Sequence, residues 1–104
     1  MDIYELLKGA IENKMQIVAT YKGLIREMCP HCLGLKGGKR HCLFYQFGGQ
    51  SSSGTIVPGS PNNWRCIPVD GLVNVEARSG PWHTQHNHSQ RQTCIDAVDV
   101  EVRN

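Results

Sequence analysis

The sequence lacks the features that would tie it to a membrane or to secretion. No apolar run approaches the roughly 20 residues of a membrane-spanning helix, and Met1-Asp2-Ile3 opens without the basic and apolar start of a secretion signal. No charge dominates either, since 11 Lys and Arg stand against 9 Asp and Glu. We therefore expect a cytoplasmic protein that does not contact a membrane. Its 104 residues, 39% apolar and 19% charged, are typical of one folded domain with a modest core.

Signatures of catalysis are also missing. No serine stands in the strained elbow context of hydrolases, and no pair of acidic residues has a spacing that indicates a cleft. The glycines at positions 34, 37 and 38 do not follow a strand and open a helix, as a phosphate-cradling loop requires. We therefore expect a binding protein and not an enzyme.

The charge is distributed unevenly along the chain. Residues 1–50 hold seven Lys and Arg against four Asp and Glu, whereas residues 51–104 hold four against five. This local excess favours an anionic partner. It is far below the basic stripe of a dedicated duplex-DNA binder.

A helix is predicted at the start of the chain, over 2–14. Its apolar residues recur at helical spacing and are Ile3, Leu6, Leu7, Ala10 and Ile11. Asp2 is placed to cap the first turn, with Glu5 completing a capping box. β-prone residues then predict a hairpin that turns at Lys22-Gly23, and Pro30 is expected to end its second strand.

The remaining chain predicts short strands separated by loops. We expect a barrel over 16–78, interrupted by a long loop rich in Gly, Ser and Pro at 48–63. A polar His-rich segment at 79–92 precedes a final strand at 95–103. Two strands should each bury one face, with the apolar positions Val73, Val75 and Ala77 in one and Val98, Val100 and Val102 in the other. The expected class is α+β, mainly β, with one helix packed on a small five- or six-stranded barrel.

The five cysteines, at positions 29, 32, 42, 66 and 94, form an odd set that cannot be a closed disulfide framework. In a reducing cytoplasm we expect buried apolar residues, metal ligands or redox thiols. Cys29 and Cys32 have a spacing that suits two zinc ligands, with His41 or Cys42 as partners. The alternatives are a thioredoxin-type redox motif, or two cysteines that merely flank Pro30. No other cofactor is expected.

A second histidine-rich group lies late in the chain. His83, His86 and His88 are candidates for a metal site that Cys94 would complete, but the segment has no periodicity that would make a rigid frame. Solvated loop histidines are the favoured interpretation.

A longer pattern brings a family resemblance. It comprises Ile11, Tyr21-x-Gly23, Arg26-x-Met28-x-Pro30-x-x-Leu33, His41-Cys42-Leu43-x-Tyr45 and Trp64-Arg65-x-Ile67-x-Val69-Asp70-x-Leu72-x-x-Val75. This pattern, over roughly residues 3–78, resembles the WYL domain. In the tripeptide that names the family, aligned with His41-Cys42-Leu43, the leucine agrees. The resemblance implies a Src-homology-3-like or Sm-like barrel preceded by a helix.

The same resemblance implies a ligand-sensing, regulatory module for an anionic ligand, either a nucleotide or single-stranded nucleic acid. The implied ligand-binding residues are Tyr21, Arg26, His41, Tyr45 and Arg65. Guanidinium groups grip phosphate in bidentate fashion and aromatic rings stack on bases, so the set is chemically coherent. WYL domains usually follow a DNA-binding helix-turn-helix module, for which these 104 residues leave no room. A separate DNA-binding or effector protein is therefore an expected partner.

Other interpretations stay open. Both arginines have structural alternatives as ion-pair partners of Glu27, Asp70 or Glu76. The whole chain has two alternative functions. One is a protein-interaction module that pairs with another chain through a barrel edge or its final strand, and that other chain can be a second copy, giving a homo-oligomer. The other is a small zinc-stabilised module.

Overall fold

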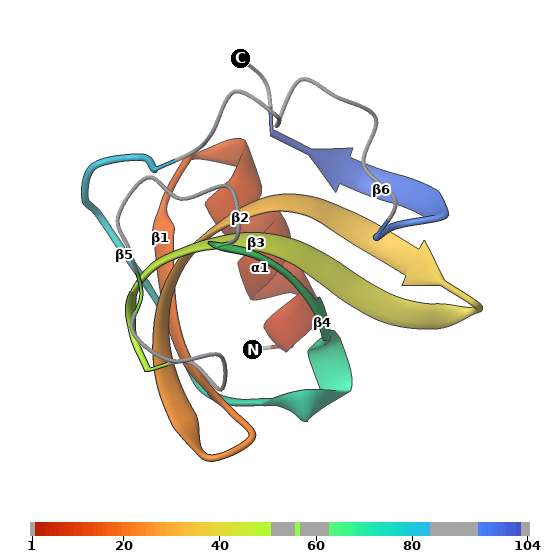
Figure 1. Ribbon diagram of the computed structural model, residues 1–104. Helices are drawn as coiled ribbons and strands as arrows, with labels where there is room; N and C mark the ends of the chain where they lie inside the picture. Colours follow the sequence, from red (N-terminus) through yellow and green to blue (C-terminus); the bar gives the residue numbers. More distant parts are fainter. Residues whose placement is uncertain (1, 51–55, 57–62, 84–93, 103–104) are drawn as a thin grey trace.

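The computed structural model describes residues 2–50, 56, 63–83 and 94–102, and it shows one helix against a curved antiparallel sheet (Figure 1). The elements in chain order are α1 (Ile3–Glu12), β1 (Gln16–Tyr21), β2 (Leu24–Lys36), β3 (Lys39–Gly49), β4 (Trp64–Pro68), the 3-10 turn η2 (Val69–Gly71), β5 (Leu72–Arg78) and β6 (Ala97–Glu101). The expected α+β, mainly β class is confirmed. The predicted elements from 84 to 93 and from 51 to 62 lie outside the described residues, apart from position 56.

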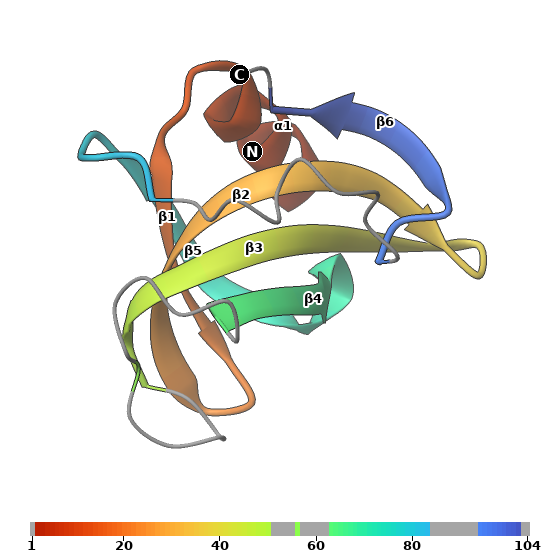
Figure 2. The same cartoon turned by 45° about the horizontal axis from the view of Figure 1, so that its top comes forward.

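The six strands form a single sheet. They pair in the order β4-β3-β2-β1-β5, and β6 lies beside the second half of β2 (Figure 2). β4 and β5, the two ends of this path, are joined through η2 and not through a strand ladder in the described part of the chain. The sheet is therefore open, and its closure into a barrel remains a prediction.

α1 lies on the sheet through its apolar face. Leu7, Ala10 and Ile11 are buried in the main core, as the helical spacing predicts. The capping box is not seen, because the Asp2 side chain makes no cap hydrogen bond and instead lies 3.8 Å from Arg40. The helix ends at Glu12, two residues before the predicted end.

The β1–β2 hairpin turns where predicted, with positive φ at Lys22 and Gly23. Pro30, however, does not end β2. It pairs with Phe44 of β3, and the register shifts between Pro30 and Cys32. This irregularity accommodates a residue that cannot donate a ladder hydrogen bond. β2 and β3 consequently form one long hairpin whose turn is confined to Gly37 and Gly38, both at positive φ.

The predicted alternation of buried and exposed side chains is confirmed only in part on β5 and β6. On β5, Val75 and Ala77 pack against the core, but Val73 is exposed. The β1–β5 register shifts between Val18 and Thr20, opposite Asn74, whose φ is 52°. This bulge changes the phase of the inward-facing positions. On β6 and beyond, Val100 and Val102 pack inward, while Val98 is exposed.

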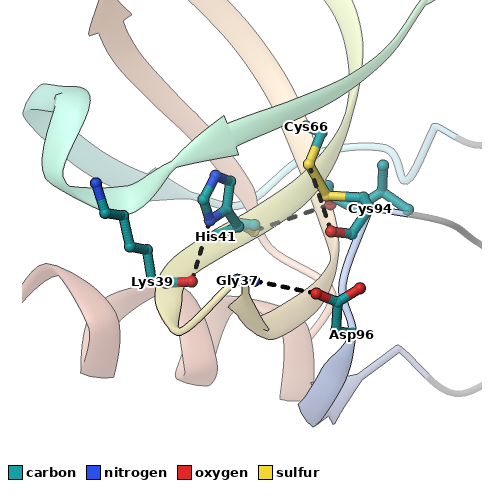
Figure 3. The surroundings of a disulfide bond; sticks show 8 residues. Gly37, Lys39, His41, Cys66, Cys94 and Asp96 are labelled. Atoms are coloured by element: carbon teal, nitrogen blue, oxygen red, sulfur yellow. Dashed lines mark hydrogen bonds between the residues drawn. A yellow bond between two sulfur atoms is a disulfide. The ribbon is translucent and has the colours of Figure 1, made fainter.

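A disulfide joins Cys66 of β4 to Cys94, which precedes β6 (Figure 3). The expectation that all five cysteines are reduced is therefore wrong for this pair, whereas Cys29, Cys32 and Cys42 are free thiols. Within the described ranges, no helical segment has the length and apolar character needed to cross a lipid bilayer.

Candidate functional site

The two arginines that the sequence singled out lie on the same face of the sheet. Arg26 on β2 pairs with Ala19 of β1, and Arg65 on β4 pairs with Phe44 of β3. Residues that pair directly across antiparallel strands share a face, and both partners belong to the main core. Arg26 and Arg65 are therefore charged residues on the core-bearing face.

Arg26 is almost completely buried, at 3% exposure. Its Cζ lies 5.2 Å from the centroid of the Tyr21 ring, and its Nη1 donates a long hydrogen bond of 3.4 Å to Gln46 Oε1. The buried Nε has no hydrogen-bond partner. Burial lowers the pKa of Arg26, because an apolar environment disfavours the charged form.

Among the described residues, no carboxylate forms an ion pair with Arg26. All nine Asp and Glu residues of the chain belong to its described part, where the ion pairs are Arg40 with Asp2 at 3.8 Å and Arg78 with Glu27 at 2.6 Å. Arg26 is in neither pair. The structural alternative in which Glu27 neutralises Arg26 is therefore not seen, because Glu27 is held by Arg78.

Arg65 brings a second positive charge to the same region. Its side chain is half-buried, and Nη1 donates to the carbonyl oxygen of Trp64 at 3.1 Å. Burial lowers the pKa of Arg65, and the charge of Arg26 lowers it further. Both arginines lie on strands that flank β3, where Arg26 pairs with Gly49 and Arg65 with Phe44.

Gln46 belongs to this site although the sequence analysis did not single it out. It is 0% exposed, and its Nε2 donates to the carbonyl oxygens of Gly48 at 3.0 Å and Gln50 at 2.7 Å. These two bonds fix the amide so that Oε1 faces Arg26. The available signal was a glutamine two residues after Phe44, on the same face of a strand covered on both faces, because a buried amide needs partners.

Tyr21 supplies the aromatic side of the site. Its ring lies against η2, where a Cβ added to Gly71 would approach Tyr21 Cε1 to 2.7 Å. Lys22 Nζ lies 5.5 Å from the ring centroid, in addition to Arg26. Tyr21, Arg26, Gln46 and Arg65 together are named the arginine site below.

Two of the predicted ligand-binding residues lie elsewhere. Tyr45 pairs with Cys29 and Trp64, which places it on the opposite face of the sheet, where it is 1% exposed with its ring 5.0 Å from that of Trp64. His41 lies near the β2–β3 turn, with Nδ1 3.1 Å from the carbonyl oxygen of Lys39 (Figure 3). The structure therefore does not bring Tyr45 or His41 to the arginine site.

The predicted zinc ligands Cys29 and Cys32 are both buried. Burial raises the pKa of Cys29 to about 11 and that of Cys32 to about 12, which disfavours the thiolate that binds zinc. Cys29 Sγ instead accepts a hydrogen bond from the backbone N–H of His83 at 3.4 Å. Among the described residues, no group of three or more His, Cys, Asp or Glu is placed to hold a metal ion. Zinc binding stays a prediction. Of the second histidine group, Cys94 is in the disulfide, and His86 and His88 lie outside the described residues.

A separate hollow lies between α1 and β6. Its lining residues are Lys8, Ile11, Glu12, Lys14, Asp99, Val100 and Glu101. Side chains of both signs of charge line this hollow.

Comparisons with protein-family models, with curated proteins and with solved structures find no match for this chain. The fold and the arginine site therefore define its class directly: an α+β protein with a six-stranded antiparallel sheet and a buried guanidinium group that has no acidic partner in the described part of the chain. The resemblance to WYL domains remains an expectation from the sequence.

Proposed function

We propose that this protein is a non-enzymatic binding module for an anionic ligand, either a nucleotide or single-stranded nucleic acid. The observation that carries the proposal is Arg26, a buried cation whose Nε has no hydrogen-bond partner and which has no acidic partner among the residues that the structure describes. An isolated buried charge costs several kcal/mol of folding free energy, and an arriving anion would offset that cost. A structural arginine would instead carry its own carboxylate.

Each member of the site has a distinct role in this proposal. The guanidinium groups of Arg26 and Arg65 hold the phosphate, and the Tyr21 ring offers an apolar surface for a base. Gln46 positions Arg26 through its fixed amide. As the WYL resemblance implies, the module acts as a regulator with a separate DNA-binding or effector protein. Its sheet closes into a small barrel through η2.

Fluorescence anisotropy with a labelled single-stranded oligonucleotide tests this proposal. Wild-type affinity should fall steeply as salt is raised, and replacement of Arg26 and Arg65 together by alanine should remove the salt-dependent part. Arg40→Ala is the matched control, because Arg40 is an exposed arginine near the β2–β3 turn that pairs with Asp2. Unchanged binding by the double variant, or equal loss with Arg40→Ala, would refute a ligand role for the arginine site.

A second candidate function is self-assembly through the β5 edge of the sheet. Ile25 of β2 and Val73 of β5 are 56% and 52% exposed, and both pair with Thr20 of β1, so they flank it on one face. Exposed apolar residues beside an edge strand favour pairing with a second copy of the chain. Light scattering after size-exclusion chromatography would then show a dimer that Val73→Lys converts to a monomer and that added salt does not weaken. A monomeric wild type would exclude this candidate.

A further inference from the structure

The guanidinium group of Arg26 has one edge in use and the other edge open. Nη1, the nitrogen on the Cδ side, donates to Gln46 Oε1 at 3.4 Å. Nε and Nη2 form the opposite edge, and neither nitrogen has a hydrogen-bond partner among the described residues. The N–H groups of these two nitrogens are parallel, so this edge can hold two oxygens of one anionic group. The open edge of Arg26 is therefore the edge that makes bidentate contacts.

The open edge offers one buried positive charge. Arg26 is 3% exposed, and no carboxylate in the described part of the chain pairs with it. Arg65 is more exposed and already donates to the carbonyl oxygen of Trp64. Lys22, whose Nζ lies 5.5 Å from the centroid of the Tyr21 ring, is exposed. Water screens the charge of an exposed side chain, so Lys22 does not call for a second negative charge in the ligand.

A charge that is removed from water is best compensated by one charge of the opposite sign. A phosphodiester inside a nucleic-acid strand has one negative charge and two equivalent non-bridging oxygens, which match the charge and the two donors of the open edge. A terminal phosphate carries about −1.5 to −2 charges at pH 7. Next to Arg26 it would hold an uncompensated negative charge away from water, which is costly, or it would first have to bind a proton.

Resting on the proposed function, we infer that the open edge of Arg26 takes a singly charged phosphate, so that the arginine site selects a phosphodiester over a terminal phosphate. A single strand and a cyclic nucleotide share this phosphodiester chemistry. A nucleoside monophosphate does not. A strand also presents a base beside each phosphodiester, and the Tyr21 ring can stack on it.

The direct test uses two competitors of a labelled, hydroxyl-ended oligothymidylate at pH 7.5. Thymidine 3′,5′-cyclic monophosphate should compete about tenfold better than thymidine 5′-monophosphate, because the monoester is mostly a dianion at this pH. A 5′- or 3′-phosphate added to the oligonucleotide should change its affinity by less than about threefold, the effect of an exposed charge. Unlabelled oligothymidylate, set against the cyclic monophosphate at equal phosphodiester concentration, distinguishes a strand from a free cyclic nucleotide.

A change of pH tests the same inference on the wild-type protein alone. The second phosphate proton binds near pH 6, so the singly charged fraction of the monoester rises from about 3% at pH 7.5 to about 76% at pH 5.5. Competition by the 5′-monophosphate should therefore strengthen by about twentyfold over this range. The cyclic monophosphate keeps one charge throughout and reports any titration of the protein, so the ratio of the two affinities gives the result.

Arg26→Lys assigns the contact to the open edge. Lysine keeps the charge but has no parallel pair of N–H groups. The variant should bind the oligonucleotide about tenfold more weakly, the cost of losing a hydrogen bond to a charged group. Arg40→Lys, at an exposed arginine that pairs with Asp2, should bind as the wild type does. Circular dichroism confirms folding, and the pH measurement decides the question if Arg26→Lys does not fold.

The outcomes separate this inference from the function on which it rests. A 5′-monophosphate that competes as well as the cyclic monophosphate at pH 7.5, with Arg26→Lys still impaired, overturns the selection of a single charge and leaves the anion-binding function intact. Wild-type affinity in a folded Arg26→Lys variant overturns the bidentate contact. Failure of the oligonucleotide and of both nucleotides to bind overturns the inference and the proposed function together.

Discussion

At the scale of single residues, Arg26 connects stability with function. Its guanidinium group is removed from water, has no acidic partner within residues 2–50, 63–83 and 94–102, and leaves Nε unsatisfied. The Tyr21 ring and the long bond to Gln46 compensate only part of this cost, since a cation–π contact contributes about 0.5–2 kcal/mol. Arg26 should therefore reduce the stability of the unliganded protein.

The first prediction follows for Arg26→Met, which keeps an unbranched side chain and removes the charge. The free energy of unfolding should rise by about 1 kcal/mol, because relief from charge desolvation exceeds the lost bond to Gln46. Binding of the anionic probe should be lost in the same variant. Urea titration and anisotropy on one preparation measure both quantities. A large loss of stability would show that Arg26 is a structural residue.

The second prediction concerns the buried thiol of Cys29. Burial raises its pKa from 9.0 to about 11, more than the His83 N–H and the Arg78 charge lower it. The unfolded chain ionises this thiol near pH 9, so the stabilising contribution is complete below pH 9 and is lost as the pH rises toward 11. In that range the unfolding free energy should fall by up to about 1.4 kcal/mol per pH unit on account of this thiol.

Cys29→Ala provides the control for this pH dependence. Its unfolding free energy should fall less steeply between pH 9 and 11, whatever its absolute stability at neutral pH, and urea titrations at intermediate pH values measure the slope. Identical slopes for wild type and variant would mean that Cys29 ionises as easily in the folded protein as in the unfolded chain.

The membership of the site could be predicted from the sequence only in part. Arg26 was implied by the resemblance to WYL domains, and its position between Leu24 and Met28 on one strand face is one where a charge needs a partner. The separation of Tyr45 from the arginines was not predictable, because it depends on which side chains of β3 lie on the same face of the sheet as Arg26. The register shift between Glu27 and Met28 in the β2–β3 ladder decides this. A shift of one residue exchanges the two faces of a strand.

At the scale of elements, strong local patterns were predictable and interruptions of the ladder were not. The apolar face of α1 and the Lys22-Gly23 turn follow from local sequence. The bulge opposite Asn74 and the continuation of β2 past Pro30 depend on neighbouring strands, which local sequence does not reveal. Tertiary pairing decides these positions, since strand propensity is a weak preference.

The third prediction tests the packing of β6 on β2. Gly34 pairs with Val98, and a Cβ at Gly34 would collide with the carbonyl oxygen of Ala97 and approach Ile95 Cγ2 to 2.7 Å. Gly34→Ala should therefore displace β6 and cost about 2 kcal/mol of stability, the usual cost of overpacking. Hydrogen exchange should accelerate at the amides of Asp96 and Val102, which donate to Leu35 and His31.

Gly9→Ala is the matched control, a substitution of the same size in α1. A Cβ at Gly9 has no neighbouring atom within 4 Å. This variant should gain about 0.5–1 kcal/mol from the higher helix propensity of alanine. If Gly34→Ala behaves like Gly9→Ala, the close approach of β6 to β2 is wrong.

At the scale of the whole molecule, the disulfide links parts of the sheet that are remote in sequence. Cys66 lies on β4, at one end of the sheet path, and Cys94 leads into β6 on the far side of β2. Five cysteines allow many pairings, and sequence spacing does not select among them. Which cysteines meet depends on the folded sheet. Cys32 of β2 pairs with Leu43 of β3, and Leu43 also pairs with Cys66 of β4. Cys94 packs in the same small cluster as Cys32 and Leu43, so it lies next to Cys66.

The fourth prediction is that this cross-link stabilises the whole fold. The bonded cysteines are 28 residues apart, and closing a loop of that length is worth about 3.6 kcal/mol through the entropy of the unfolded chain. Replacement of Cys66 and Cys94 by alanine should lower the unfolding free energy by that amount, and dithiothreitol should have the same effect on the wild type. Dithiothreitol should leave the double variant unchanged, since Cys29, Cys32 and Cys42 are free thiols. Equal stability of oxidised and reduced wild-type protein would show that interstrand packing, and not the cross-link, holds β6 in place.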